Sequence, residues 1–205
     1  MRKQSILMMF LCGLLAFTFQ TNDSEAKRRR RAKKRSSSKY FRVFSFRTQW
    51  SKDWQKWRVR TSQGNGFIRT KWSKNWQKWS IRLGRKRAFL RTQWSKDWQK
   101  WRLRFPGGRA FIRTKWSKDW QKWRVTYKYR GRTRIIHIRT KWSKNWQKWN
   151  IRGRRGRMFV RTRWSKDWQK WTIRDQMKGE NRFVKVTAAF ICVLSGAVFK
   201  RVRLR

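Results

Sequence analysis

The most abundant functional side chains in this sequence are cationic, and the chemistry they suit best is the binding of anions. The chain of 205 residues holds 60 Lys plus Arg against 8 Asp plus Glu, which gives a net charge of +52. A compact molecule with this charge repels itself unless counterions or a polyanionic partner neutralise it. The composition therefore argues against a cytosolic enzyme for small molecules and favours an acidic polymer as partner.

Groups suited to catalysis or metal binding are scarce. His137 is the only histidine, and it takes a repeat position that phenylalanine fills in four other units, which predicts a packing role. One repeat position carries Asp53, Asp97, Asp119 and Asp167, with Asn75 and Asn145 in the two remaining units. A carboxylate that an amide can replace is typical of a turn, not of a general acid. We therefore expect no enzymatic activity, no metal and no cofactor.

An internal repeat must position the cations. The motif WSKxWQKW occurs six times, and its first tryptophans are Trp50, Trp72, Trp94, Trp116, Trp142 and Trp164. These are 22 residues apart, except for one spacing of 26. With 18 Trp, 14 Phe and 3 Tyr, the chain also has the apolar surface that disordered basic tails lack.

The repeat fits strands better than a helix. An antiparallel hairpin with residues 73–76 as its loop places Thr70 opposite Trp79 and Ile68 opposite Ile81, and a second hairpin with loop 84–87 places Ile81 opposite Leu90. Continued along the chain, this pairing produces a ladder of mostly β-branched residues on the same face as the Trp rows. An amphipathic helix through WSKxWQKW is the alternative, since its three Trp lie at i, i+4 and i+7. That alternative leaves the flanking alternation unexplained.

The longer spacing between Trp123 and Trp142 supports the strands. Four extra residues would disturb a helical repeat, but they lengthen a hairpin by two residues on each strand and keep every side chain on its face. We expect the loop of this hairpin at residues 130–133.

The predicted fold is all-β. We expect an antiparallel meander of about 12 to 14 strands, built from six 22-residue hairpin repeats plus a degenerate seventh, and closed or folded over its aromatic face. The repeats span residues 45–174, and residues 175–205 are expected to form a terminal apolar hairpin that continues the sheet.

The N-terminal residues indicate export. Residues 1–26 have the pattern of a secretion signal, with Arg2 and Lys3, an apolar run over residues 6–19 and a small-x-small sequence at 24–26. An uncleaved anchor is the alternative, but its apolar run is shorter than the roughly 20 residues that span a bilayer. Residues 27–44 form a basic arm rich in Ser, Arg and Lys. We expect the protein in the periplasm, the cell envelope or the extracellular space, with Cys192 unpaired.

One face of the predicted sheet is lined with cations. Like charges opposite one another destabilise a sheet, so this face is expected to exist for an anionic ligand. A solubility surface is the alternative, but mixed charges provide solubility with less repulsion. The predicted polyanion-binding residues are Arg69, Arg91, Arg102, Arg113, Arg124, Arg139 and Arg161, with Lys71, Lys78, Lys100, Lys115, Lys122, Lys141, Lys148 and Lys170.

The tryptophans divide into core and contact residues. Trp72, Trp79 and their equivalents are expected in the core, on the same face as the β-branched ladder. The second Trp of each motif falls in a loop and is the candidate for stacking on sugars or bases, or for contact with a membrane interface. These residues are Trp54, Trp76, Trp98, Trp120, Trp146 and Trp168.

The sequence thus predicts a non-enzymatic, exported repeat protein that binds acidic polymers such as nucleic acid, lipopolysaccharide or acidic polysaccharide. One alternative is a structural or membrane-associated protein of the cell envelope, although strands of about seven residues are shorter than the 9 to 11 that span a bilayer. Another is a cationic, membrane-active defence protein.

Overall fold

A computed structural model describes residues 40–199, with the exception of Lys52, Lys74, Lys96, Lys118, Arg130, Lys144 and Lys166. The chain divides into two units, Met1–Tyr40 and Phe41–Arg205. Every described helix and strand belongs to the second unit. The predicted secretion signal and residues 27–39 of the basic arm lie outside the described residues.

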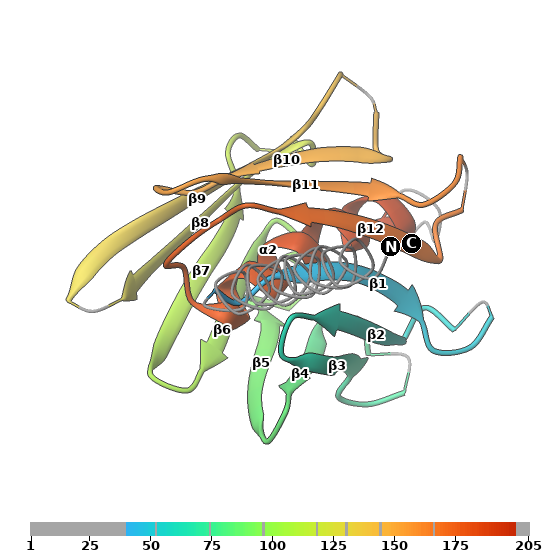
Figure 1. Cartoon of the computed structure of the whole chain (residues 1–205), viewed down its shortest axis with the longest axis horizontal. Coiled ribbons are helices and arrows are strands. Elements are labelled where there is room, and N and C mark those ends of the chain that lie inside the picture. Colours follow the sequence, from blue (N-terminus) through green and yellow to red (C-terminus); the bar gives the residue numbers. More distant parts are fainter. Residues whose placement is uncertain are drawn as a thin grey trace, which may run out of the picture. The chain divides into compact units, whose positions relative to one another are not determined.

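Twelve antiparallel strands form a closed barrel, which confirms the predicted meander (Figure 1). Each strand pairs with its neighbours in the chain, and β1 pairs with β12, so that no strand edge is left open. The strands are β1 (Val43–Thr48), β2 (Lys56–Thr61), β3 (Gly64–Thr70), β4 (Lys78–Leu83), β5 (Lys86–Thr92), β6 (Lys100–Phe105), β7 (Gly108–Thr114), β8 (Lys122–Tyr129), β9 (Arg132–Thr140), β10 (Lys148–Arg152), β11 (Arg157–Thr162) and β12 (Lys170–Asp175).

The register within each repeat is as predicted, but the register between repeats differs by two residues. Ile68 lies opposite Ile81 in the β3–β4 pairing. In the β4–β5 pairing, Ile81 lies opposite Ala88 and not opposite Leu90. The connecting turn is two residues long and not four, because Gly84 adopts a positive φ of 59° that suits a tight hairpin turn. A shift of two residues leaves each side chain on its predicted face.

This offset explains why the sheet closes. Within each repeat the third Trp of the motif lies opposite a threonine, as Trp79 does opposite Thr70. Between repeats, including the closing pair β12–β1, the same Trp lies opposite the residue two positions before that threonine, as Trp171 does opposite Phe46. A stagger repeated in one direction tilts the strands, and such tilt is what a closed barrel requires.

The hairpin that carries the four extra residues is lengthened as predicted. β8 has eight residues and β9 has nine, whereas β6 has six and β7 has seven. Tyr129 pairs with Arg132, so the turn is again two residues and not the predicted four.

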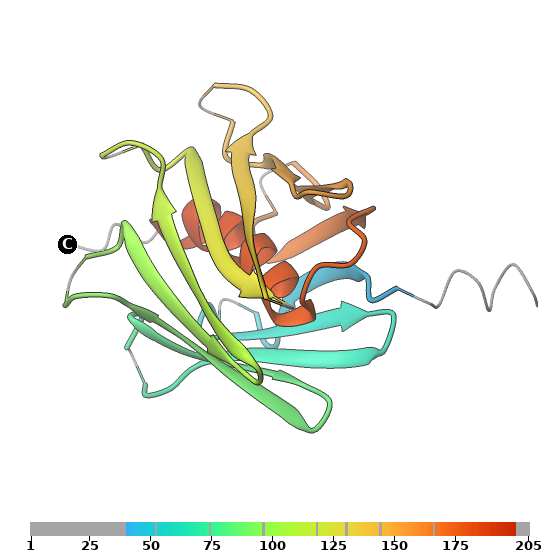
Figure 2. The same ribbon diagram turned by 90° about the vertical axis from the view of Figure 1, so that its left-hand side faces the viewer.

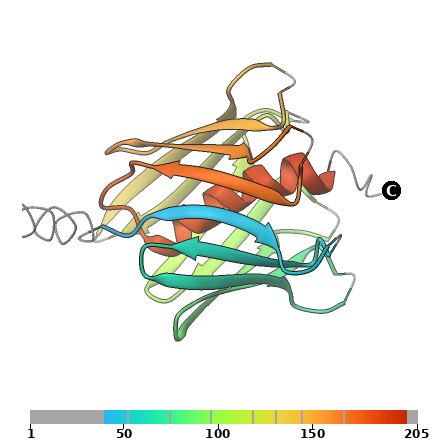
Figure 3. The ribbon, with the colours of Figure 1, turned by 45° about the vertical axis from the view of Figure 1, so that its right-hand side comes forward.

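The prediction of a terminal hairpin is wrong. The helix α2 (Arg182–Val193) and a π-helical segment η1 (Leu194–Phe199) follow β12, and every residue of α2 from Phe183 onward is buried. Figures 2 and 3 show α2 enclosed by the strands. The Phe190 ring lies among Phe46, Trp57 and Trp79, with centroids 6.1, 6.2 and 5.0 Å away.

Barrel closure is the physical reason for this helix. Since β1 and β12 pair with each other, a seventh hairpin has no edge to join. A barrel of twelve strands is also wider than one whose own side chains fill it, and a helix fills an apolar interior while satisfying its own backbone hydrogen bonds. Asn181 caps the helix by accepting a hydrogen bond from the Phe183 amide at 2.9 Å.

Two groups of contacts fix the start of the helix at the rim formed by the turns between repeats. The Lys185 ammonium is 2.8 Å from the Asp175 carboxylate and donates to the carbonyl oxygens of Phe41 and Met177. On the lengthened hairpin, Tyr127 donates to Glu180, and Arg134 donates to the carbonyl oxygen of Gly179 at 2.7 Å. The lengthened hairpin therefore holds the segment that leads into α2.

Candidate functional site

The outward-facing side chains of β1–β12, which we call the outer wall, carry most of the predicted cations. All fifteen predicted polyanion-binding residues lie on the outside of the barrel, where Arg102 and Arg124 are half-buried and the others are exposed. Lys71, Lys115 and Lys141 lie just beyond the ends of their strands. The alternation along each strand explains this arrangement, because the residues between these cations are buried.

Cations face cations across neighbouring strands of the outer wall. Among the described strands this occurs in nine of the twelve pairings. Examples are Lys56 with Arg69, Lys78 with Arg91, Arg91 with Arg102, Lys100 with Arg113, Arg113 with Arg124, Lys122 with Arg139 and Lys148 with Arg161. Among these examples, only Arg91 with Arg102 and Arg113 with Arg124 pair within a repeat, where the register is as predicted. The other five, and further pairs such as Arg82 with Arg87 and Arg104 with Arg109, depend on the register between repeats, which the sequence reasoning missed. Each such pair weakens the sheet.

The carboxylates of the described residues lie elsewhere. Asp175 and Glu180 are buried at the rim of the turns between repeats. Asp53, Asp97, Asp119 and Asp167 lie in the loops within the repeats, where each accepts the backbone N–H of the glutamine two residues later at 3.0 Å. These are the turn roles predicted for them. The outward positions of the twelve strands contain no described carboxylate, but three loop carboxylates reach lysines at the strand starts: Asp97, Asp119 and Asp167 lie 3.8, 3.5 and 3.9 Å from Lys100, Lys122 and Lys170. The arginines of the wall are not among these ion pairs.

Some arginines of the outer wall have hydrogen-bonding capacity to spare. The Nε atoms of Arg58, Arg102 and Arg124 are buried and have no hydrogen-bond partner in the described part of the chain. The guanidinium groups of Arg58 and Arg102 lie over the rings of Phe67 and Phe111, 5.9 and 5.4 Å from the ring centroids. Because these Nε atoms are enclosed by protein, contact of such a guanidinium with phosphate, sulfate or carboxylate oxygens would use its other N–H donors.

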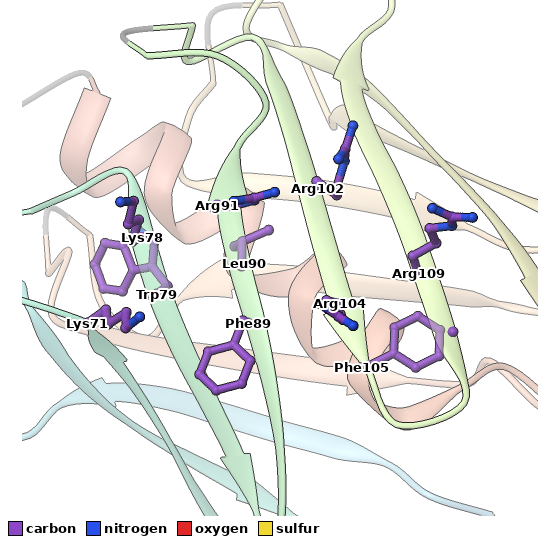
Figure 4. A pocket seen from close by; sticks show the side chains of 11 residues that line it. Lys71, Lys78, Trp79, Phe89, Leu90, Arg91, Arg102, Arg104, Phe105 and Arg109 are labelled. Atoms are coloured by element: carbon purple, nitrogen blue, oxygen red, sulfur yellow. The ribbon is translucent and has the colours of Figure 1, made fainter.

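The outer wall is hollowed between its long side chains. One open hollow crosses β4–β7 and is lined by Lys78, Phe89, Arg91, Arg102, Arg104 and Arg109, among others (Figure 4). Another is lined by Lys122, His137, Arg139, Arg152, Arg157 and Phe159, among others. Both combine an aromatic ring with several cations, which suits a ligand that carries rings and anionic groups together.

His137 occupies the place on the outer wall that Phe111 holds in the preceding repeat unit. The pKa of His137 is lowered, mainly because the imidazole is partly removed from water. The positive charges of Arg124, Lys115 and Arg152 lower it further. This shift favours the neutral imidazole.

The three tryptophans of each motif have three different environments. The third, such as Trp79, is fully buried, as predicted. The first, such as Trp72, was predicted in the core but lies beyond the end of its strand with 60% of its surface exposed. The second, such as Trp76, was the candidate for exposure but is half-buried, and its ring packs 5.8 Å from that of Trp79.

Hydrogen bonds explain this assignment. The indole Nε1 of each buried Trp donates to the carbonyl oxygen of the second Trp in its motif, at 2.7 to 2.9 Å, in all six repeats. This bond holds the loop against the barrel interior and leaves the first Trp outside it. The stacking role predicted for Trp54, Trp76, Trp98, Trp120, Trp146 and Trp168 is therefore limited to their exposed edges.

Comparisons with models of known protein families, with curated proteins and with solved structures found no match to this chain. Within the described residues, no helix combines the length and the apolar character needed to cross a membrane. The same residues contain no group of three or more His, Cys, Asp or Glu side chains arranged to hold a metal ion.

Proposed function

We propose that this protein is a non-enzymatic, exported binder of acidic polymers, such as nucleic acid, lipopolysaccharide or acidic polysaccharide, and that the outer wall is its binding surface. The observation that carries the proposal is the direct opposition of cations in nine of the twelve strand pairings. Each opposed pair costs stability, and a bound polyanion converts that cost into binding energy.

The spacing of the cations fits an extended polymer. Neighbouring strands are ~4.8 Å apart, so cations on successive strands recur at a separation comparable to that of charges along a nucleic acid or an acidic glycan. The wall surrounds the barrel, and its described hollows lie over different strands. We therefore expect weak dependence on base sequence and strong dependence on salt concentration.

The test is the salt dependence of binding to single-stranded DNA and heparin. Replacement of Arg69, Arg91 and Arg113 together by glutamine removes three exposed cations from β3, β5 and β7. We expect the slope of log affinity against log salt concentration to fall by roughly 2 to 3 units, at about 0.7 to 0.9 per neutralised phosphate. Fluorescence anisotropy of labelled DNA across a salt series measures this slope.

A matched triple variant controls for net charge. Arg85, Arg154 and Arg155 are exposed in the turns between repeats, so their replacement by glutamine removes the same charge without touching the outer wall. We expect a smaller change in slope for this variant. The proposal is wrong if the wall variant keeps the parent slope, or if the turn variant lowers it equally.

A further inference from the structure

We propose that the rim formed by the six loops within the repeats docks onto the interfacial region of an anionic lipid membrane. We call this end of the barrel the Trp rim; its described residues are 49–51, 53–55, 71–73, 75–77, 93–95, 97–99, 115–117, 119–121, 141–143, 145–147, 163–165 and 167–169. It bears the first tryptophan of every motif, and these six side chains are 60 to 65% exposed. They are Trp50, Trp72, Trp94, Trp116, Trp142 and Trp164. The Trp rim is distinct from the outer wall, so this inference goes beyond polyanion binding.

The geometry of the Trp rim suits a flat partner. All six loops have seven residues between their strands and the same hydrogen bonds to the indole and to the Asx turn, so each exposed indole leaves its loop in the same local setting. Consecutive loops are two strands apart, or about 10 Å along the rim. A surface as broad as the rim can therefore contact several of these indoles at once, whereas a narrow extended polymer reaches only neighbouring ones.

The chemistry of the rim suits the lipid headgroup region. Tryptophan is enriched at membrane interfaces because its ring is apolar and its N–H is polar. Four of the six indoles have a cation beside the ring, with Lys71, Lys115, Lys141 and Arg163 placing their charges 5.2 to 5.8 Å from the centroids. Cations at this level attract anionic headgroups. The rim carboxylates accept backbone N–H groups of their own loops, and Asp97, Asp119 and Asp167 also pair with the lysines at the start of the following strands.

A second copy of this chain is a poorer partner for the same surface. Contact between two Trp rims would bring together two surfaces of like net charge, since the sequence of each rim has ten Lys and Arg against four Asp, and association would then carry a repulsive cost. An anionic membrane instead complements both the indoles and the cations.

The test measures partitioning of the natively processed protein into vesicles of phosphatidylglycerol and phosphatidylcholine in equal parts. Near 1 M salt the Debye length is only about 3 Å, which suppresses electrostatic binding through the outer wall. Replacement of Trp72, Trp94 and Trp116 by alanine should then lower the partition coefficient about 100-fold. That estimate assumes roughly 60 Å² of apolar surface buried per indole at about 25 cal/mol/Å², or tenfold each, with incomplete additivity.

The control variant replaces Phe67, Phe89 and Phe111 by alanine. These rings are 39 to 46% exposed, but they lie on the outer wall. We expect the partition coefficient of this Phe variant to change by less than about threefold. We also expect the Trp variant to keep the salt slope of the parent protein on heparin, so that this inference and polyanion binding can fail separately. Circular dichroism checks that both variants fold.

Three results would overturn the inference. The Trp variant could keep the parent partition coefficient, or the Phe variant could lose as much. The third contradicting result is a Trp variant that loses affinity for single-stranded DNA but still binds vesicles. The Trp rim would then be a platform for stacked bases.

Discussion

A single residue inserted between Leu90 and Arg91 is expected to destabilise the barrel by more than about 4 kcal/mol. Side chains alternate between the interior and the outer wall along β5, so one extra residue turns either Arg91 or Arg87 into the apolar interior. An unpaired buried charge is among the most destabilising changes in a protein. Because β5 pairs on both sides, a bulge would disturb two ladders at once. Urea unfolding followed by circular dichroism measures the loss.

A longer insertion at a turn is the control. Two residues inserted between Gly84 and Arg85 should cost less than about 1 kcal/mol, because the rim of the turns between repeats already accommodates a four-residue connection at residues 153–156. The lengthened β8–β9 hairpin shows the same tolerance. Equal stability of the one-residue and two-residue variants would contradict the assignment of faces.

Replacement of Lys185 by methionine should lower the free energy of unfolding by about 3 to 5 kcal/mol, the usual effect of removing one partner from a buried ion pair. The Lys185 side chain is 1% exposed and that of Asp175 is fully buried. Burial lowers the pKa of Lys185, and Asp175, the nearest opposing charge, works against that shift. Without the ammonium, the Asp175 charge keeps only the amides of Val43 and Met177 as partners.

The exposed Lys86 in β5 provides the matched control for this variant. Its replacement by methionine removes the same charge from the surface and should change stability by less than about 0.5 kcal/mol. If Lys185→Met is as stable as Lys86→Met in urea, the ion pair does not hold α2 in the barrel.

The strands and their faces could be predicted from the sequence because the repeat supplies the same alternation six times. Each copy constrains the others. The two extra residues on β8 and the two on β9 keep every side chain on its face only if side chains alternate with a period of two. The register between repeats could not be predicted in the same way. Two-residue and four-residue turns give the same faces, and the choice depends on whether Gly84 takes a positive φ.

The roles of the tryptophans were only partly predictable. Spacing places Trp79 on the inner face, but Trp72 and Trp76 follow the end of a strand, where alternation no longer applies. Their exposure depends on the bond from the Trp79 indole to the Trp76 carbonyl, which the sequence does not reveal. As a result, the exposed tryptophans of the Trp rim are the first Trp of each motif and not the second.

The helix α2 was missed because nine of its twelve residues are apolar and its second half is an unbroken apolar run, residues 188–194. Such a run has neither a period of two nor one of 3.6, so it fits a buried strand and a buried helix equally. Asn181, which caps the helix, was the available signal for a helix start. The space inside the barrel then decides the outcome, since it accommodates one helix and offers no strand edge.

Protection of lysines from acetylation by heparin tests most directly whether the outer wall binds polyanions. Mass spectrometry reports the modification of each lysine in the presence and absence of the polymer. We expect Lys78, Lys100, Lys122, Lys148 and Lys170, all exposed on the wall, to be protected several-fold. Protection confined to Lys27, Lys33, Lys34 and Lys39 would show that the basic arm alone binds the polymer, and would contradict the role proposed for the barrel.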